Sequence, residues 1–313
     1  MTRRRLLLGV LQRLGGLVVV FLGVTFLIYL MVFTLPGDPI AALGGQRPLS
    51  PSVVQALRAQ YHLDDPVGVQ YLRFLGGLLH GDLGTSFTGR SVAEQLALRW
   101  PVTIVLALTA WFLELVIGIG LGVVAALRAG TLVDRAILVT TIAVSAVPVF
   151  VLGSVAQLVL GVRLRWLPVA GTTAGWPVAF LLPGLVIAVF GLAAVARLTR
   201  TSMLEGLGAD YVRTARAIGL APRRVVGVHV LRNSLIPTVT YLGTDLGYLL
   251  GGTVIVEGIF NLPGVGNLLV QSIRSHEGPT VVGISTALIV IFLLTSVLVD
   301  LTHALLDPRI RRG

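Results

Sequence analysis

The chain contains no cysteine and no lysine, and only 12% of its 313 residues are charged. The absence of cysteine excludes disulfide bonds and thiolate chemistry. All 24 basic residues are arginine, so Schiff-base catalysis is excluded, as is the GxxxxGK[ST] loop with which P-loop proteins hold the phosphates of ATP. Any ATP-driven process in which the chain takes part must therefore use a nucleotide, with its magnesium, bound by another subunit. No cofactor is expected on the chain itself.

Hydrophobic residues are abundant instead, at 55% with a mean hydropathy of +0.91. This composition is typical of an all-α integral membrane protein that crosses the bilayer several times. The net charge of +10 is interpreted as membrane topology and not as binding of nucleic acid.

Six uncharged or nearly uncharged runs predict six transmembrane helices. The first, residues 14–33, is long enough for the ~30 Å hydrocarbon core, and it is too long, with no A-x-A-like cleavage site after it, for a signal peptide. The others are expected at about 101–127, 136–160, 178–196, 234–256 and 280–301. The expected organisation is a cytoplasmic N-terminus with the first span (1–33), an extracytoplasmic segment (34–100), a five-helix core (101–303) and a cytoplasmic tail (304–313).

The arginines set the orientation of these spans. Sixteen lie in the segments on the side of the two termini and eight lie on the opposite side, five of them in the long 34–100 segment, which is beyond the length for which such counts are reliable. Both termini are therefore predicted to be cytoplasmic. Turn residues in the 34–100 segment separate two short helices, predicted at 52–61 and 67–79.

The longest polar interruption in the second half of the chain, Asp210–Pro237, has the pattern of a folded segment. Gly219 stands where a helix would end in a left-handed cap, and Pro222 stands where the next helix would begin. Before the glycine, apolar residues at helical spacing face away from two arginines. These residues are Tyr211, Ala215 and Ile218 on one side, and Arg213 and Arg216 on the other.

This segment resembles the cytoplasmic loop, or EAA motif, of ABC importer permeases. Ala215 and Gly219 match the general motif. The local sequences RTARAIGL and HVLRNSLIP are similar to those of the dipeptide/oligopeptide/nickel branch, although this chain has Ile218 where that branch usually has lysine. PGDP, GDLG, EGIFNLPGVG (257–266) and the DPRIR tail extend the resemblance over nearly the whole chain. The closest likeness is to the B subunit of dipeptide permeases.

The resemblance implies a type I importer fold in a bacterial or archaeal cell membrane and a permease without an ATPase site of its own. The implied partners are a second, different permease chain, two ATP-binding subunits and an extracytoplasmic binding protein. The 197–233 region would be the coupling loop, or else an ordinary basic cytoplasmic loop. Its expected contact residues are Asp210, Tyr211, Arg213, Ala215, Arg216, Gly219, Leu220, Arg223, His229 and Arg232.

The fifth predicted span, 234–256, carries the polar residues of most interest. Tyr241, Asp245 and Tyr248 share one face, which either lines the translocation path or, at Asp245, provides a hydrogen-bonding group inside the bundle. Another face bears a stripe of Gly243, Gly247 and Gly251, the pattern that allows close helix approach.

Two further features of the predicted spans concern helix packing. The second span has a similar small-residue motif, Gly118 and Gly122, with Glu114 expected to turn inward. Pro148 and Pro183 are candidate kinks in the third and fourth spans.

The sequence provides no catalytic constellation and no cluster of metal ligands. The expected function is import of dipeptides or oligopeptides by alternating access. Nickel, sugar or haem-like cargo remains an alternative, as does an ion-coupled secondary transporter, although no inverted repeat is evident.

Overall fold

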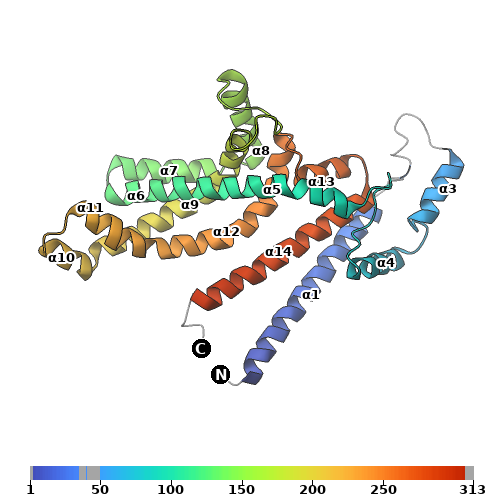
Figure 1. Ribbon diagram of the computed structural model, residues 1–313, viewed down its shortest axis with the longest axis horizontal. Helices are drawn as coiled ribbons and strands as arrows, with labels where there is room; N and C mark the ends of the chain where they lie inside the picture. The colour runs from blue at the N-terminus through green and yellow to red at the C-terminus, as the bar shows by residue number, and fades with distance from the viewer. Residues whose placement is uncertain (1–2, 35–39, 41–49, 307–313) are drawn as a thin grey trace. The chain divides into compact units, whose positions relative to one another are not determined.

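The computed structural model describes residues 3–34, 40 and 50–306 (Figure 1). Within them every regular element is a helix, apart from one antiparallel bridge between Thr85 and Ser91. The predicted all-α class is therefore confirmed. The PGDP turn (36–39) and the DPRIR tail (307–311), on which part of the family resemblance rests, lie outside the described residues.

In the described part of the chain, four helices are long and apolar enough to cross a membrane. They are Gly15–Thr34, Val92–Leu127, Val178–Gly208 and Gly278–Leu298. Two bent pairs also pass the test when each pair is taken together: Leu132–Ser145 with Val149–Arg163, bent by 104°, and Pro222–Leu249 with Gly251–Ile259, bent by 56°. The total equals the predicted six if each bent pair is one span.

Contacts divide the chain into two compact units. The first unit comprises Met1–Pro101 and Gly264–Gly313, and the second comprises Val102–Pro263. The helices of the first unit are α1 (Arg3–Thr34), α3 (Pro51–Gln60), α4 (Val67–Leu79), α13 (Val265–Arg274) and α14 (Gly278–Leu306). The two short helices predicted in the 34–100 segment are confirmed by α3 and α4.

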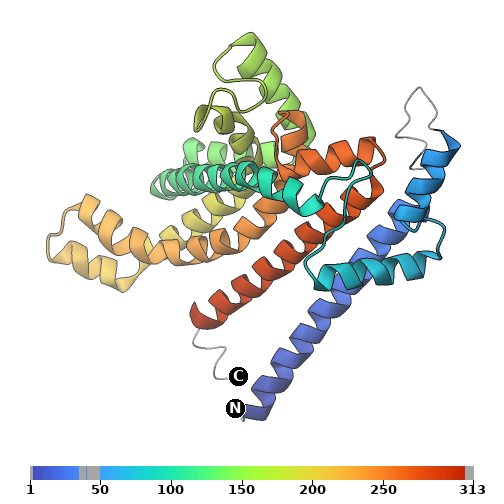
Figure 2. The same ribbon diagram turned by 45° about the vertical axis from the view of Figure 1, so that its right-hand side comes forward.

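Within the first unit, α1 and α14 lie side by side (Figures 1 and 2). Tyr71 of α4 packs with Tyr29 of α1 and Val282 of α14 in a buried cluster. The Tyr71 hydroxyl and the Thr25 hydroxyl are 2.9 Å apart in this cluster. The short helix α4 is thus attached to α1 by both apolar burial and a buried polar contact.

The second unit is built around one central helix, α9 (Val178–Gly208). In α9, 67% of the residues in its most apolar segment are buried, the highest share among the four long apolar helices of the described chain. Its neighbours are the π-helical segment η1, α6, α7, α8 and α12. The elements of this unit other than α9 are α5 (Val92–Leu113, which begins in the first unit), η1 (Glu114–Gly118), α6 (Ile119–Leu127), α7 (Leu132–Ser145), α8 (Val149–Ala156), η2 (Gln157–Arg163), α10 (Asp210–Ala217), α11 (Pro222–Arg224), η3 (Val225–Val230) and α12 (Leu231–Ile259).

Glycines let the backbone of the second predicted span approach α9 closely. A Cβ at Gly118 would lie 2.6 Å from a Val195 methyl carbon, and one at Gly122 would lie 2.6 Å from the Ala196 carbonyl oxygen. Neither distance is possible for real carbon atoms, so any larger residue would push the helices apart. The predicted packing role of this glycine pair is confirmed.

Helix bounds differ from the predictions at three places. The helix predicted to begin at Pro101 begins at Val92, where Ser91 and Glu94 form the Ser-x-x-Glu pattern of a helix start. The third span begins at Leu132, and its first helix, α7, ends at Ser145. Pro148 immediately precedes the next helix, α8, so the bend near this proline is far sharper than the expected kink. Pro183, in contrast, lies inside an unbroken α9.

The third difference is the end of the fourth span. Helix α9 continues to Gly208 instead of ending near Ala196. The first part of the region predicted as a loop is therefore helical. Its additional turns are held by burial of Thr199 and Met203, both fully buried.

Candidate functional site

The segment predicted to be a coupling loop is a compact helical turn. Helix α10 ends at Ala217, Gly219 adopts a left-handed φ of 83°, and α11 starts at Pro222. The Leu220 amide donates to the Ala215 carbonyl oxygen at 3.1 Å, which closes the helix end as a left-handed cap does. The predicted order of helix, glycine hinge and second helix is confirmed.

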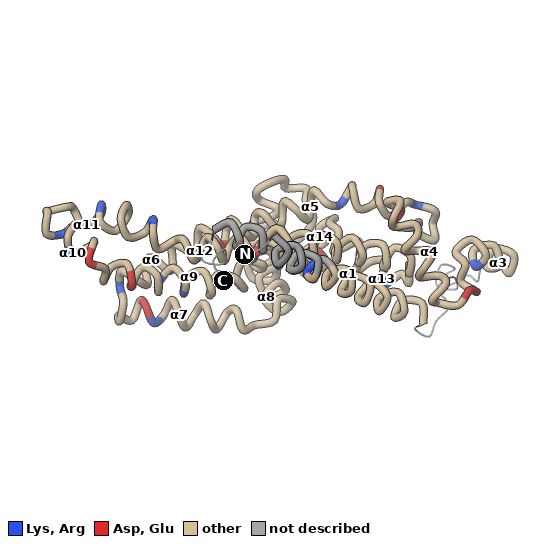
Figure 3. The backbone as a smooth tube through the Cα atoms, turned by 90° about the horizontal axis from the view of Figure 1, so that it is seen from below, with Lys and Arg blue, Asp and Glu red and all other residues tan. Residues whose placement is uncertain are grey.

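Most of the predicted contact residues of this loop are exposed. Asp210, Tyr211, Arg213, Arg216, Gly219, Arg223 and Arg232 are exposed, whereas Leu220 and His229 are half-buried. Figure 3 shows charged residues of the second unit at α10, α11 and the start of α7. The turn therefore presents a strongly basic, ordered surface.

The predicted apolar face of α10 is divided in two. Ala215 is only 8% exposed and packs, with Val212, against Met203 and Val230 of the same chain. Ile218, in contrast, is 71% exposed. The expectation that Ala215 belongs to an outward apolar face is wrong, because helix α10 must bury one side to dock on its own unit. The outward apolar residues are Tyr211 and Ile218.

A second group of polar residues lies between η1, α9 and α12. Glu114 is fully buried, and its carboxyl group lies close to that of Asp245 without a hydrogen bond between them. Gly191 of α9 makes room for this arrangement, since a Cβ there would overlap the Glu114 carboxyl group. The prediction that Glu114 turns inward is confirmed.

This acidic pair has few hydrogen-bond donors. The Tyr241 hydroxyl donates to Oδ1 of Asp245 across 3.4 Å, a weak interaction. Among the described residues, both Glu114 oxygens and Oδ2 of Asp245 are buried without a hydrogen-bond partner. Two neighbouring carboxylates repel each other when both are charged, so a proton or a cation here would stabilise the pair.

Asp245 borders a cavity of about 380 Å³. Its walls include the three predicted path residues Tyr241, Asp245 and Tyr248, together with Phe190 and Gly251. The structure thus brings the three predicted residues to one cavity. Glu114, which the sequence indicated only as a packing residue, has its carboxyl group against Gly191, another residue of the cavity wall.

The glycine stripe of α12 is only partly covered within this chain. Gly247 is buried, whereas a Cβ at Gly243 or Gly251 would meet nothing within 4 Å among the described residues. Close helix approach is instead found at Gly118 and Gly122, described above.

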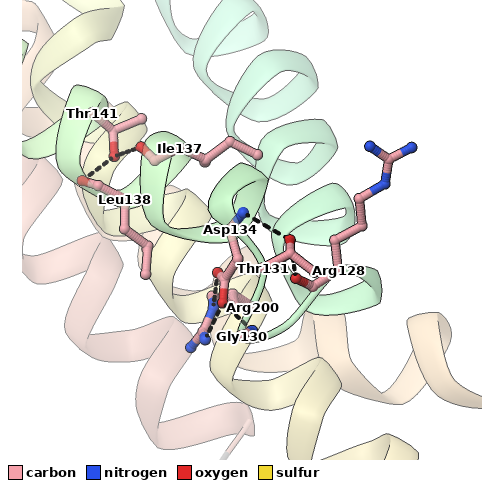
Figure 4. A network of polar contacts seen from close by, with 8 residues as sticks. All are labelled: Arg128, Gly130, Thr131, Asp134, Ile137, Leu138, Thr141 and Arg200. Atoms are coloured by element: carbon pink, nitrogen blue, oxygen red, sulfur yellow. Dashed lines mark hydrogen bonds and ion pairs between the residues drawn. The ribbon is translucent and has the colours of Figure 1, made fainter.

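A buried ion pair that the sequence did not reveal joins α7 to α9 (Figure 4). Asp134, 2% exposed, accepts from Arg200 at 2.6 Å (Nε to Oδ1) and 2.7 Å (Nη2 to Oδ2). The Gly130 amide donates to the same carboxylate at 2.9 Å, and Thr131 caps the N-terminus of α7. The sequence indicated only that an acid and an arginine both lie in regions assigned to cytoplasmic turns, and not that they pair.

The fold and these two sites define a class of protein: a multi-pass helical membrane component with an ordered basic turn and a polar cavity in its bundle. The chain belongs to the family described as binding-protein-dependent transport system inner membrane component, whose model matches residues 118–312. The N-terminal model of the same system matches residues 6–107. It is therefore a permease of an ABC importer in the inner membrane, and the family indicates no catalytic domain.

Similar proteins extend over nearly the full chain. The dipeptide transport system permease protein DppB of Escherichia coli K12 is 35% identical, covering 96% of this chain and 98% of its own. A putative peptide transport system permease of Brucella abortus is 38% identical, and the di/tripeptide permease DppB of Pseudomonas aeruginosa is 36% identical. Both cover 96% of this chain, and this chain covers 98% and 97% of theirs.

Two solved structures share the fold. A chain of the MetNI methionine ABC transporter superposes with a TM-score of 0.53 at 18% identity, covering 66% of this chain and 94% of its own. A chain of an amino acid ABC transporter has a TM-score of 0.51 at 15% identity, covering 67% and 93%. The predicted type I importer fold is confirmed by these neighbours.

Proposed function

We propose that this permease imports di- or oligopeptides that an extracytoplasmic binding protein delivers, and that separate ATPase subunits drive the transport. The names of the relatives, all of which are peptide permeases, support the cargo. The proposed assembly contains this chain, a second and different permease chain, and two ATP-binding subunits that hold ATP and magnesium. The chain itself hydrolyses no ATP, in keeping with its lack of lysine.

The observation that carries the ATP coupling is the exposed basic turn at 210–232. Its backbone is fixed by the left-handed Gly219 and by burial of Val212 and Ala215. A rigid turn of this kind transmits movement of a docked subunit to α9 and α12, which flank it in the chain. Tyr211 and Ile218 provide the apolar contact with the ATPase, and Arg213 and Arg216 provide polar contacts around it.

The test of cargo and driving force is uptake of a radiolabelled dipeptide into proteoliposomes that contain the complete transporter and its binding protein. ATP enclosed with the ATPase subunits should drive accumulation, and a proton or sodium gradient without ATP should not. Accumulation that follows an ion gradient would contradict the proposal and favour a secondary transporter. ATP-driven uptake of nickel or haem, with dipeptides excluded, would overturn the cargo alone.

The docking role of the turn is tested by Ile218→Glu, with Leu132→Glu as a matched control. Both side chains are exposed, 71% and 81%, so neither substitution removes core packing. A charge at Ile218 must lose its water when the ATPase covers it, and we expect at least a tenfold loss of ATP-coupled uptake together with loss of ATPase co-purification. Leu132→Glu should retain both. Equal behaviour of the two variants would contradict docking at the turn.

A further inference from the structure

The cavity between α8, α9 and α12 combines features that rarely occur together inside a membrane bundle. It has an acidic residue, Asp245, in its wall, and its other wall residues include the aromatic side chains of Phe190, Tyr241 and Tyr248. Its volume of about 380 Å³ lies within the usual range for small-molecule sites. Aromatic faces around a carboxylate form the typical environment of an ammonium group.

The second and independent observation is the unpartnered Glu114. This side chain is fully buried, lies against Gly191 of the cavity wall, and has both oxygens without a hydrogen-bond partner among the described residues. A buried polar group without a partner is destabilising. A proton on Glu114 would reduce this deficit, because the acid would then donate a hydrogen bond to Oδ2 of Asp245, which also has no partner among the described residues.

The protonated Glu114 leaves one negative charge on the pair, and Asp245 carries it at the cavity wall. No salt bridge to Asp245 or Glu114 occurs in the described part of the chain. The carboxylate of Asp245 thus remains available to a mobile cation.

We propose that this cavity binds the α-ammonium group of a peptide during its passage, with Asp245 as the counter-charge and Glu114 as the positioning residue. Glu114 acts through Asp245, because its protonated carboxyl group donates a hydrogen bond to one Asp245 oxygen and orients the other toward the cavity. The aromatic rings of Tyr241 and Tyr248 face the bound cation. This inference rests on the proposed peptide cargo, and it assigns a solute contact within the permease itself.

The first experiment measures protection of the acidic pair from dicyclohexylcarbodiimide, an apolar reagent that modifies protonated carboxyl groups in membranes. The complete transporter in nanodiscs is treated with the reagent, and adducts on Glu114 and Asp245 are mapped by mass spectrometry. Butylammonium and the dipeptide Ala-Ala should slow the modification at least threefold. Butanol and N-acetyl-Ala-Ala, which lack the cation, should not slow it.

Several outcomes would overturn the proposal. If Glu114 and Asp245 are modified equally with and without the two amines, the cavity has no ammonium site. If butanol protects them as well as butylammonium does, the cavity binds apolar groups and does not recognise the cation. Protection by butylammonium but not by Ala-Ala would exclude the peptide α-ammonium as the ligand. Protection by Nα-acetyl-lysine but not by Ala-Ala would mean that the cavity binds the ammonium group of a basic side chain instead of the peptide α-ammonium group.

Variants separate the roles of the two acids. Asp245→Asn should abolish the cation-specific protection of Glu114 and raise the butylammonium concentration that half-inhibits ATP-driven uptake at least tenfold. Glu114→Gln keeps a donor beside Asp245, so its half-inhibitory concentration should stay within threefold of the parent value. Glu114→Leu should shift it as Asp245→Asn does. The control Thr240→Val, which removes a hydroxyl bonded only to its own helix, should change nothing.

A merely structural role for Glu114 predicts equal loss of uptake in its Gln and Leu variants without a shift in amine inhibition, and that result would contradict the proposal. The proposed function is judged separately. ATP-driven dipeptide uptake without amine protection would overturn the site alone. Amine protection that depends on Asp245, in a complex with no ATP-driven uptake, would overturn the transport proposal alone.

Discussion

Two buried carboxylates in the second unit have opposite surroundings. The Asp134 carboxylate accepts two bonds from Arg200 and one from the Gly130 amide (Figure 4). Glu114 is equally inaccessible, yet it lies near a second acid and against Gly191 of the cavity wall, with no donor among the described residues. One group is fully compensated, and the other is compensated only by a proton.

The difference separates a structural group from a functional one. A compensated ion pair between α7 and α9 fixes two helices and leaves nothing to bind a ligand. Burying an acid without hydrogen-bond partners costs free energy. A functional role in the neighbouring cavity would explain why the chain has such an acid here. The contrast makes specific predictions, because removal of an acid or its partner should have opposite consequences at the two places.

The largest effect is expected from Arg200→Met. This change leaves the Asp134 carboxylate without its counter-ion, so the free energy of unfolding should fall. Because the Arg200 side chain is 23% exposed, water relieves part of that loss. The free energy of unfolding, measured by SDS titration in mixed micelles, checks this prediction.

The double variant Asp134→Leu with Arg200→Met provides the control for that prediction. Removing both charges together removes the unpaired group, so the double variant should be more stable than Arg200→Met alone. If the double variant is the less stable of the two, Asp134 and Arg200 do not act as a coupled pair. The interpretation of Asp134 as a compensated structural group would then be contradicted.

A smaller loss is expected from Gly191→Ala. The new methyl group would overlap the Glu114 carboxyl group, and overpacking of this kind costs about 1–3 kcal/mol. Gly120→Ala is the matched control, since a Cβ there meets nothing within 4 Å, and it should be neutral or slightly stabilising. Glu114→Ala combined with Gly191→Ala should recover stability relative to Gly191→Ala. No recovery would mean that Glu114 is not the group that α9 accommodates.

The sequence was sufficient for the coupling turn and insufficient for the ion pair. Gly219 and Pro222 mark local backbone requirements, so a left-handed turn between two helices could be predicted from them directly. Asp134 and Arg200 meet only because α7 packs on α9, and such a contact has no local signature. The face of α10 was assigned wrongly at Ala215 for the same reason, since periodicity identifies an apolar side but not what covers it.

The cavity falls between these cases. Tyr241, Asp245 and Tyr248 lie on one helix, so their shared face followed from helical spacing. The contribution of Glu114 depends on Gly191, a residue 77 positions away in the chain, and on the close approach of α6 and η1 to α9 at Gly118 and Gly122. The glycine motif predicted close packing, but not which helix would be the partner.

The smallest effect on stability, and the most direct test of the contrast, is expected from Glu114→Gln set against Asp134→Asn. In Glu114→Gln, the new side-chain amide would donate to Oδ2 of Asp245 without needing a proton, so the free energy of unfolding should be unchanged or higher by up to about 1 kcal/mol. Asp134→Asn removes the charge that Arg200 needs and should lower it. SDS titration of the two purified variants, with the parent chain alongside, measures both changes. A loss in Glu114→Gln as large as that in Asp134→Asn would show that the Glu114 carboxyl group is a compensated structural group like Asp134, and the two acids would no longer differ in kind.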